Sequence, residues 1–383
     1  MRIAAACLFS AALMATACRA EPAAPTAASP IDASLPSGRL MPPEPVTQHV
    51  WVMRQPDRLW AAVIGNVEII EQSDGVVLVD SGGTIGDGED VIAAVGRLTA
   101  KPIKAVIITH WHNDHPLGIP AVLAKFPKAR IIATEWTAKV MAYPDVLKVG
   151  IGKPDEKLYK TRLEGAVETS GEFRKSADDP SLSSDERHQF AIEAAWVMER
   201  AKRQLPNYVA LPTESFADQL KIDDPVAPVQ ALYLGRANTR GDAIVWLPKQ
   251  KVMISGDAVV APTPYGFSDL MEPWLATLDR MEKYDFHILI PGHGKVQRDR
   301  SYLATLRWSL ADIRSQADAL AKTNASAEEA AKRFDRTEQR RRFGATDGWT
   351  KRWLDSYWLD GMFEVAFKQA RNLPVESGTD GGE

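Results

Sequence analysis

The residues with the clearest capacity for chemistry lie in one short segment. Three histidines and one aspartate, His110, His112, Asp114 and His115, fall within six residues. Imidazole nitrogen and carboxylate oxygen are the ligands that zinc and neighbouring divalent metals prefer in proteins. Polar residues of an ordinary loop are not expected to cluster in this way, so the segment predicts a metal site.

Each chemically capable residue directly follows a run that is typical of a buried strand. Uncharged, largely β-branched runs precede the His110 segment, Asp80, Asp257 and His293. These predicted strands lie at residues 105–108, 76–79, 252–255 and 286–290. Gly292 and Gly294 flank His293 and allow the backbone to approach a site closely. Strand ends that meet at one edge would form a site whose ligands are distributed along the chain. Asp80 could accept a hydrogen bond from a metal-binding histidine, or it could simply form a turn.

The elements between these strands alternate in a way that predicts an α/β fold. Helical spacing over 87–98, 118–125 and 135–141 alternates with strands at 50–52, 59–64, 67–70 and 129–133. Residues 143–212 interrupt this pattern as an insertion, with an irregular first half and a second half that has the apolar spacing of an amphipathic helix. Strands resume at 216–222, 229–234 and 243–247. Residues 301–373 form a helical extension, and 374–383 a disordered tail.

Composition narrows the class of protein. The chain has 383 residues, 45% hydrophobic and 25% charged, which suits an ordinary globular protein. A net charge of −4 argues against nucleic acid as a partner. The two cysteines, Cys7 and Cys18, both precede the folded region, so that region is expected to contain neither a disulfide nor a thiolate ligand.

The N-terminus is typical of an export signal. A positive Met1-Arg2 start, a short apolar core and small residues predict a signal peptide over residues 1–20. Cys18 follows Ala15-Thr16-Ala17 and could be the acylated residue of a lipoprotein, which would tether the protein to a membrane; cleavage after Ala17 or Ala20 is the alternative. Residues 21–45 are rich in Ala and Pro and predict a flexible tether. The protein is therefore expected to be periplasmic or lipid-anchored.

The order of these segments resembles the metallo-β-lactamase superfamily. The resemblance rests on Asp80, His110-x-His112-x-Asp114-His115, the Gly235–Asp242 loop, Gly256-Asp257 and Pro291-Gly292-His293-Gly294. It implies an αββα sandwich over residues 46–300 and one or two zinc ions. His110 and His112 would bind the first metal, Asp114, His115 and His293 the second, and Asp257 both.

One position departs from the family pattern. The family normally places a third histidine for the first metal in the Gly235–Asp242 loop, where this chain has Asn238. An amide oxygen is a neutral and weaker zinc ligand than imidazole. The first site could be weak but occupied, Asn238 could bind a harder ion, or the protein could use one metal or only bind its ligand. His49 and His287 are expected to be structural or surface residues.

The resemblance implies hydrolysis by a metal-bound hydroxide. The expected substrate is a small-molecule ester, lactone, thioester or β-lactam, with Asp114 orienting the nucleophile or moving its proton. Trp111, Tyr265 and Phe267 are candidates for the substrate pocket, although core packing is slightly favoured for Trp111. A catalytically impaired binding protein and an iron-dependent enzyme resembling persulfide dioxygenases are the alternatives. The oligomeric state stays open.

Overall fold

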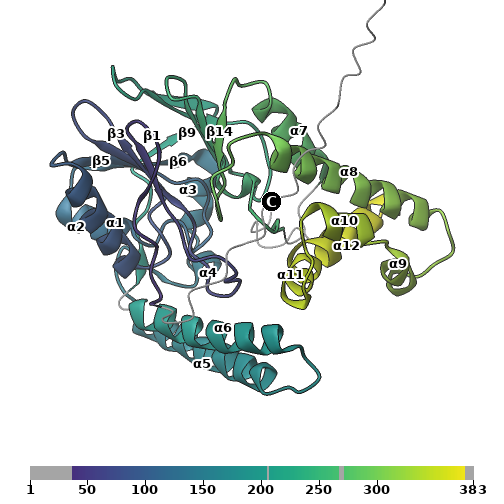
Figure 1. Cartoon of the computed structure of the whole chain (residues 1–383). Coiled ribbons are helices and arrows are strands. Elements are labelled where there is room, and N and C mark those ends of the chain that lie inside the picture. Colours follow the sequence, from purple (N-terminus) through teal and green to yellow (C-terminus); the bar gives the residue numbers. More distant parts are fainter. Residues whose placement is uncertain (1–36, 205–206, 267–270, 376–383) are drawn as a thin grey trace, which may run out of the picture.

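The protein is an αββα sandwich, as predicted. The computed structural model describes residues 37–204, 207–266 and 271–375. Two sheets pack face to face, and helices cover both outer faces (Figure 1). The predicted signal peptide, most of the predicted tether, Phe267 and residues 376–383 lie outside the described residues. Within them, no helix is long and apolar enough to cross a membrane.

The first sheet is mixed and contains seven strands. Its order is β1-β2-β3-β4-β5-β6-β9, with β4, β5, β6 and β9 parallel to one another. The strands are β1 (Glu44–Thr47), β2 (Val50–Met53), β3 (Val67–Glu71), β4 (Val76–Val79), β5 (Ile103–Ile107), β6 (Arg130–Thr134) and β9 (Glu214–Phe216). Leu40 is buried and β1 begins at Glu44, so the folded chain starts a few residues before the predicted end of the tether at residue 45.

The second sheet contains five strands in sequence order. They are β10 (Gln219–Ile222), β11 (Val229–Tyr233), β12 (Ala243–Leu247), β13 (Val252–Ile254) and β14 (Ile288–Ile290). Only β13 and β14 are parallel. The single strand predicted over 216–222 is wrong, because the chain leaves the first sheet after Phe216 and enters the second at Gln219. The short β7 (Gly150–Ile151) and β8 (Tyr208–Val209) pair separately.

Three apolar layers hold the sandwich together. Aliphatic side chains from both sheets, including Val79, Ile107, Val245 and Ile254, fill the space between them. The outer face of the first sheet packs on α1 (Ile85–Leu98), α2 (Ile119–Lys125), α3 (Glu135–Met141) and α4 (Pro144–Leu147). The outer face of the second packs on α7 (Met271–Met281) and α8 (Ser301–Ala321). Burial on both faces explains why the central strands read as continuous apolar runs.

The insertion is a helical hairpin. It consists of α5 (Glu156–Ala177) and α6 (Ser184–Arg203). Ser183 and Glu186 form a reciprocal capping box that begins α6. The irregular first half predicted for 143–212 is wrong over α5. This helix buries only Ser170 among its residues, so its sequence carries no apolar stripe to reveal it.

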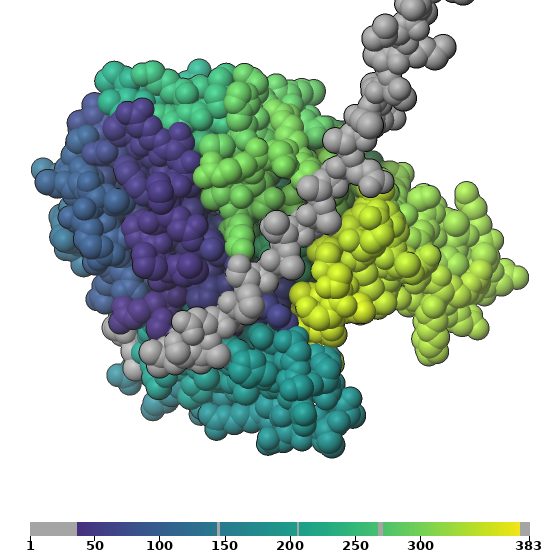
Figure 2. Space-filling model, in the orientation of Figure 1, coloured from purple at the N-terminus to yellow at the C-terminus, as the bar shows by residue number. Residues whose placement is uncertain are grey.

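The C-terminal region is helical, as predicted, and reaches back to the insertion. It contains α9 (Ala327–Arg333), α10 (Thr337–Arg342), α11 (Gly348–Leu354), the π-helical turn η2 (Asp355–Leu359) and α12 (Asp360–Ala370). Trp349 and Trp353 pack with Phe190 of α6 in one apolar cluster. Figure 2 shows the teal surface of the α5–α6 hairpin adjoining the yellow surface of these helices.

Candidate metal centre

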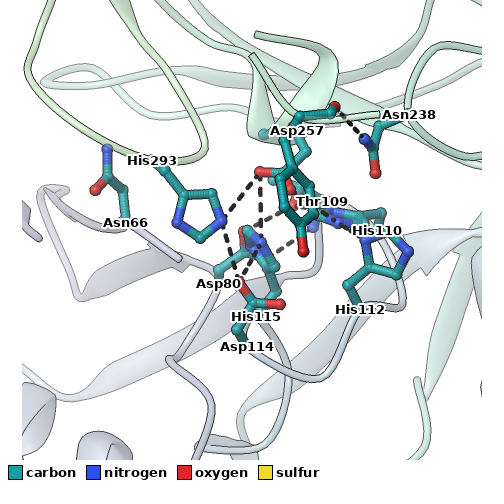
Figure 3. Close-up of polar contacts among 12 residues, drawn as sticks. Asn66, Asp80, Thr109, His110, His112, Asp114, His115, Asn238, Asp257 and His293 are labelled. Atoms are coloured by element: carbon teal, nitrogen blue, oxygen red, sulfur yellow. Dashed lines mark hydrogen bonds and ion pairs between the residues drawn. The ribbon is translucent and has the colours of Figure 1, made fainter. Parts of the chain in front are cut away.

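Six predicted ligands meet at one edge of the sandwich. The loop after β5 provides His110, His112, Asp114 and His115, while Asp257 lies in the turn η1 (Gly256–Ala258) after β13, and His293 follows β14 (Figure 3). β4 and β5 are parallel neighbours in one sheet, and β13 and β14 are parallel neighbours in the other. The carboxyl ends of these strands therefore carry their side chains to a common point.

The ligand atoms form two groups of three. In the first group, His110 Nε2 lies 2.9 Å from His112 Nδ1 and 3.6 Å from Asp257 Oδ2. In the second, Asp114 Oδ2 lies 3.0 Å from His293 Nε2 and 3.4 Å from His115 Nε2. Asp257 Oδ1 lies 3.5 Å from the Nε2 atoms of both His115 and His293. The two oxygens of Asp257 thus face different groups.

These separations fit a metal ion. Two nitrogen or oxygen ligands at roughly 2.0–2.1 Å from a tetrahedral zinc lie about 3.3 Å apart. The observed separations of 2.9–3.6 Å bracket this value. His115 Nε2 and Asp257 Oδ1 are also buried without a hydrogen-bond partner, which is costly unless a cation or another ligand contacts them.

The surroundings favour a neutral imidazole at His110 and ionised carboxylates at Asp114 and Asp257, the forms in which these side chains bind metals. Burial and the charge of His115 hold the pKa of His110 well below its usual range, so its imidazole is neutral. Burial opposes ionisation of Asp114 and Asp257, but neighbouring histidines hold the pKa of each carboxyl well below normal. The same carboxylates outweigh burial at His293 and raise its pKa to about 9. Both carboxylates are therefore ionised, as metal ligands are.

Asp80 orients one histidine in each group. Its Oδ2 accepts hydrogen bonds from His115 Nδ1 and from the Thr109 hydroxyl, both at 2.7 Å. The Thr109 hydroxyl oxygen in turn lies 3.1 Å from His110 Nδ1 and can accept a hydrogen bond from it. This network places hydrogen on Nδ1 of both histidines and directs Nε2 of each into the site, where a metal ion would take the place of a proton. Asp80 has a φ of 59°, a left-handed conformation that Asp and Asn tolerate better than most residues.

Asn238 lies beside the metal ligands, and only the nitrogen of its side-chain amide has a hydrogen-bond partner. Its Nδ2 donates to the backbone oxygen of Tyr265 at 3.0 Å, whereas its buried Oδ1 has no partner. Figure 3 places Asn238 on the same side of the site as His110 and His112, away from His293. The free atom is thus the amide oxygen, the one that could contact a cation.

Hydrogen bonds to Asp242 fix the conformation of the loop that carries Asn238. Asp242 Oδ2 accepts the backbone N–H groups of Ala237 and Thr239 at 3.0 and 2.8 Å. Burial raises the pKa of Asp242 to about 7 although these bonds oppose the shift. Asn238 is therefore placed by a fixed turn. His49 and His287 lie elsewhere, paired with Glu71 and Asp285 respectively, so neither replaces the missing histidine.

Two glycines leave room for the ligands. A Cβ atom on Gly292 would lie 2.0 Å from Asp257 Oδ1, and one on Gly65 would lie 2.4 Å from the His115 ring. Real Cβ atoms do not approach other atoms so closely, so any side chain at these positions would displace a ligand. The sequence indicated this role for Gly292 but not for Gly65.

A cleft borders Asp114 and the metal ligands on the solvent side. Its walls come from the loop 60–63, from Tyr265, from Tyr357 in η2 and from the insertion. A second, largely apolar cleft adjoins His293 and shares Trp60, Val63 and Tyr265 with the first. Tyr265 therefore lines both clefts. Phe267 lies outside the described residues.

Trp111 does not line either cleft, which corrects its assignment to the substrate pocket. Its side chain is 5% exposed and packs in the core between the first sheet and its helices. The ring contacts His112 edge-on at 4.4 Å. Trp111 therefore supports a ligand-bearing loop and does not contact the cleft.

Sequence reasoning missed the wall formed by residues 59–64. This segment was predicted as a strand because it is apolar, but it is a loop in the structure. Glu193 of α6 accepts the backbone N–H groups of Trp60 and Ala61, at 2.5 and 3.3 Å. Tyr357 contacts the same loop, its hydroxyl donating to the Trp60 oxygen at 3.3 Å. No spacing in the sequence links these distant segments.

Known proteins resemble this chain in sequence over part of their length. A linear primary-alkylsulfatase from Pseudomonas sp. is 27% identical over 248 residues, which cover 59% of this chain and 41% of that protein. A hydroxyacylglutathione hydrolase from Enterobacter sp. is 33% identical over 69 residues, 18% of this chain and 26% of that protein. The chain thus spans less than half the length of these relatives.

Structural and family comparisons extend the likeness over most of the chain. The stereoselective inverting sec-alkylsulfatase Pisa1 from Pseudomonas sp. shares the fold with a TM-score of 0.57 at 17% identity, covering 85% of this chain and 50% of that one. The sequence pattern of the metallo-beta-lactamase superfamily matches residues 60–293, more than half of the chain and all six ligands. The chain belongs to the metallo-beta-lactamase superfamily, a family of hydrolases.

Proposed function

We propose that the protein is a zinc-dependent hydrolase that cleaves an ester, lactone, thioester or β-lactam bond in a small molecule. The observation that carries this proposal is the pair of three-residue ligand groups, joined by the two oxygens of Asp257. The first group would hold one zinc, with Asn238 Oδ1 as a weak additional ligand, and the second group would hold another. The second group has a full set of charged and imidazole ligands and is proposed to bind more tightly.

The roles of the residues follow from their positions. A zinc ion, when bound, supplies a water of lowered pKa and polarises the bond to be cleaved. Asp114 lies at the border of the cleft, with 19% of its side chain exposed, so its carboxylate can be reached from the cleft and can accept a proton there. His293 Nε2 lies 3.0 Å from Asp114 Oδ2, so these two side chains would hold the same ion. Asp80 keeps His110 and His115 in the required tautomers.

The relatives indicate the kind of bond. Their names include a linear primary-alkylsulfatase, a hydroxyacylglutathione hydrolase and an atrochrysone carboxyl ACP thioesterase. These activities share attack at an ester or thioester and no redox step. They support ester-type hydrolysis more than the oxygen-dependent alternative.

A substrate panel combined with metal quantification tests this proposal. The protein is purified without chelator, its zinc and iron contents are measured, and it is assayed with alkyl sulfates, carboxylic esters, thioesters, lactones and a β-lactam. We expect bound zinc and turnover of at least one class that is lost on dialysis against a chelator and restored by zinc. Protein without bound metal would overturn the proposal. Bound iron with oxygen uptake would favour the iron-dependent alternative.

The unpaired Oδ1 of Asn238 favours a second candidate, a protein that binds a ligand without turnover. Asn238→His separates the two. An enzyme with a weakened first site should gain zinc and activity from the added imidazole. A protein that remains inactive on the whole panel before and after the change, while its zinc content rises, would be a binding protein.

We also propose that the protein is exported, as its N-terminal sequence predicts. Fractionation of cells that express the full chain should place it in the periplasm or the membrane fraction. Cys18→Ala distinguishes the two forms, because only an acylated protein would move from the membrane to the soluble fraction on this change. Retention of the uncleaved chain in the cytoplasm would contradict export.

A further inference from the structure

The cleft beside Asp114 contains an arginine, Arg162, that forms no ion pair with any carboxylate in the described part of the chain. The cleft has a volume of about 310 Å³, and the insertion contributes Arg162, Arg200 and Gln204 to it. Arg162 comes from α5, whereas Arg200 and Gln204 come from α6 and its C-terminal end. The two arginines differ in what they contact.

Arg200 is fully paired within the protein. It is 2% exposed, and its Nη1 and Nη2 donate to the two oxygens of Asp87, both at 2.7 Å. Nη1 also donates to the Gly38 oxygen at 2.9 Å. This bidentate pair attaches α6 to α1 and neutralises the charge. Arg200 is therefore a structural residue of the cleft wall.

Arg162 has only neutral partners. Its Nε donates weakly to Gln204 Oε1 at 3.4 Å, and its Nη1 donates to the Leu147 oxygen at 3.2 Å. Among the side chains that the structure describes, which leave out those of residues 144 and 145, no carboxylate forms an ion pair with Arg162. The side chain is half-buried, and burial lowers its pKa, although an arginine stays charged at any ordinary pH. A half-buried cation with unused donors is unfavourable until an anion contacts it.

The rest of the cleft is suited to the apolar part of such an anion. Trp60, Val63 and Tyr357 line the same cleft as Asp114 and Arg162. The adjoining cleft is lined by Leu59, Trp60 and Pro262 and is mainly apolar. A ligand that contacts both Asp114 and Arg162 in this cleft would therefore also have apolar and aromatic side chains within reach.

We propose that Arg162 binds an anionic group of the substrate, and that the enzyme selects esters which carry a carboxylate, sulfate or phosphate group separated from the cleaved bond by an apolar segment. This inference rests on the proposed function, because it assigns the substrate class of the same site. The guanidinium fork would bind the oxyanion through two parallel N–H donors, which a lysine cannot reproduce. Arg162 is thus proposed as a specificity-determining residue supplied by the insertion.

Two esters of equal chain length provide the central comparison. The 4-nitrophenyl monoester of glutaric acid ends in a carboxylate, whereas 4-nitrophenyl pentanoate ends in a methyl group. Zinc-loaded wild type is expected to prefer the glutarate ester. Arg162→Met should lower kcat/KM for that ester by about ten- to a hundredfold, the loss of one charged hydrogen-bonded contact, and leave the pentanoate unchanged. Arg162→Lys should give a kcat/KM for the glutarate ester between those of the wild type and Arg162→Met.

Controls separate charge recognition from folding. Arg174→Met removes the same charge from an exposed position of α5 and should change neither ester. Arg162→Gln keeps a donor for the Leu147 oxygen and serves if the Met variant is unstable. Equal losses for both esters, or no loss for either, would overturn the role of Arg162.

A binding measurement keeps this inference separate from the proposed function. Glutarate binding to the zinc-loaded wild type and to the Arg162 variants is measured by calorimetry, with no turnover required. If the wild type hydrolyses nothing but binds glutarate in an Arg162-dependent manner, the hydrolase proposal fails and the anion site stands. If the pentanoate is hydrolysed but glutarate binds equally to all variants or to none, the anion site fails and the hydrolase stands.

Discussion

Asp80→Asn is the sharpest test of how the metal centre is organised. Three donors converge on Asp80: the Thr109 N–H at 2.8 Å and, at 2.7 Å each, the Thr109 hydroxyl and His115 Nδ1. Asparagine has nearly the same shape and tolerates the left-handed backbone at this position, whereas alanine would add strain. The substitution therefore changes hydrogen bonding while leaving the backbone in place.

The size of the effect follows from the donors and acceptors. An amide that keeps its oxygen toward the Thr109 N–H turns its NH₂ toward His115 Nδ1 and the Thr109 hydroxyl. His115 then loses its acceptor, and the Thr109 hydroxyl, now accepting from Asn, can donate to His110 Nδ1 and move the hydrogen of that ring to Nε2. Loss of such an orienting partner costs about 10–100-fold in metal affinity, or roughly 1.4–2.7 kcal/mol. Both ligand groups should be affected, because each contains one of these histidines.

Zinc titration against a competing chelator measures the predicted loss, and urea unfolding of the metal-free protein measures stability separately. Asp224→Asn is the matched control, since Asp224 accepts several bonds from Ser73, Val226 and Ala227 in a turn far from the ligands. The control should lose stability but keep its zinc affinity. If Asp80→Asn lowers the free energy of unfolding and leaves the zinc affinity of both sites unchanged, the assigned orienting role is refuted.

The loop of Asn238, the close approach of Gly292 and the buried Glu193 can each be tested by substitution. Asn238→His should raise the zinc content of protein dialysed at low zinc, measured by metal quantification, and an unchanged content would show that the loop does not face the first group. Gly292→Ala should weaken zinc binding and cost about 1–3 kcal/mol in unfolding free energy, because its Cβ would lie 2.0 Å from Asp257 Oδ1, whereas Gly165→Ala, with open space around it, should not destabilise. Burial raises the pKa of Glu193 from 4.5 to about 8, so its contribution to stability is complete below pH 4.5 and declines by about 1.4 kcal/mol per pH unit until pH 8. Urea unfolding across this range should show that decline in the wild type and a weaker one in Glu193→Gln; identical slopes would exclude Glu193 as the cause.

The sandwich and the ligand set could be predicted because local sequence determines them. Each ligand follows a strand that is buried on both faces, so a continuous apolar run and an abrupt polar residue identify it without any long-range information. Asp80 illustrates the limit. Its place at a strand end was visible, but its contact with His115 across 35 positions was only one of two interpretations until the structure showed it.

The substrate-facing wall could not be predicted in the same way. The segment 59–64 has the composition of a strand, yet Glu193 and Tyr357 hold its backbone as a loop from positions 133 and 297 residues away. Helix α5 was missed because only one of its residues is buried. Both cases depend on packing between distant segments, which periodicity does not record.

The separate origins of ligands and wall have an evolutionary consequence. All six ligands lie between His110 and His293 in segments that directly follow strands of the sheets. Apart from Tyr265, most of the wall comes from other segments: the 60–63 loop before the ligands, the hairpin inserted among them and Tyr357 of η2 after them. Substitutions or length changes in these three segments could alter the accepted molecule and leave the metal chemistry untouched. In this chain, the residues proposed for the reaction and those proposed for selectivity therefore lie in different segments.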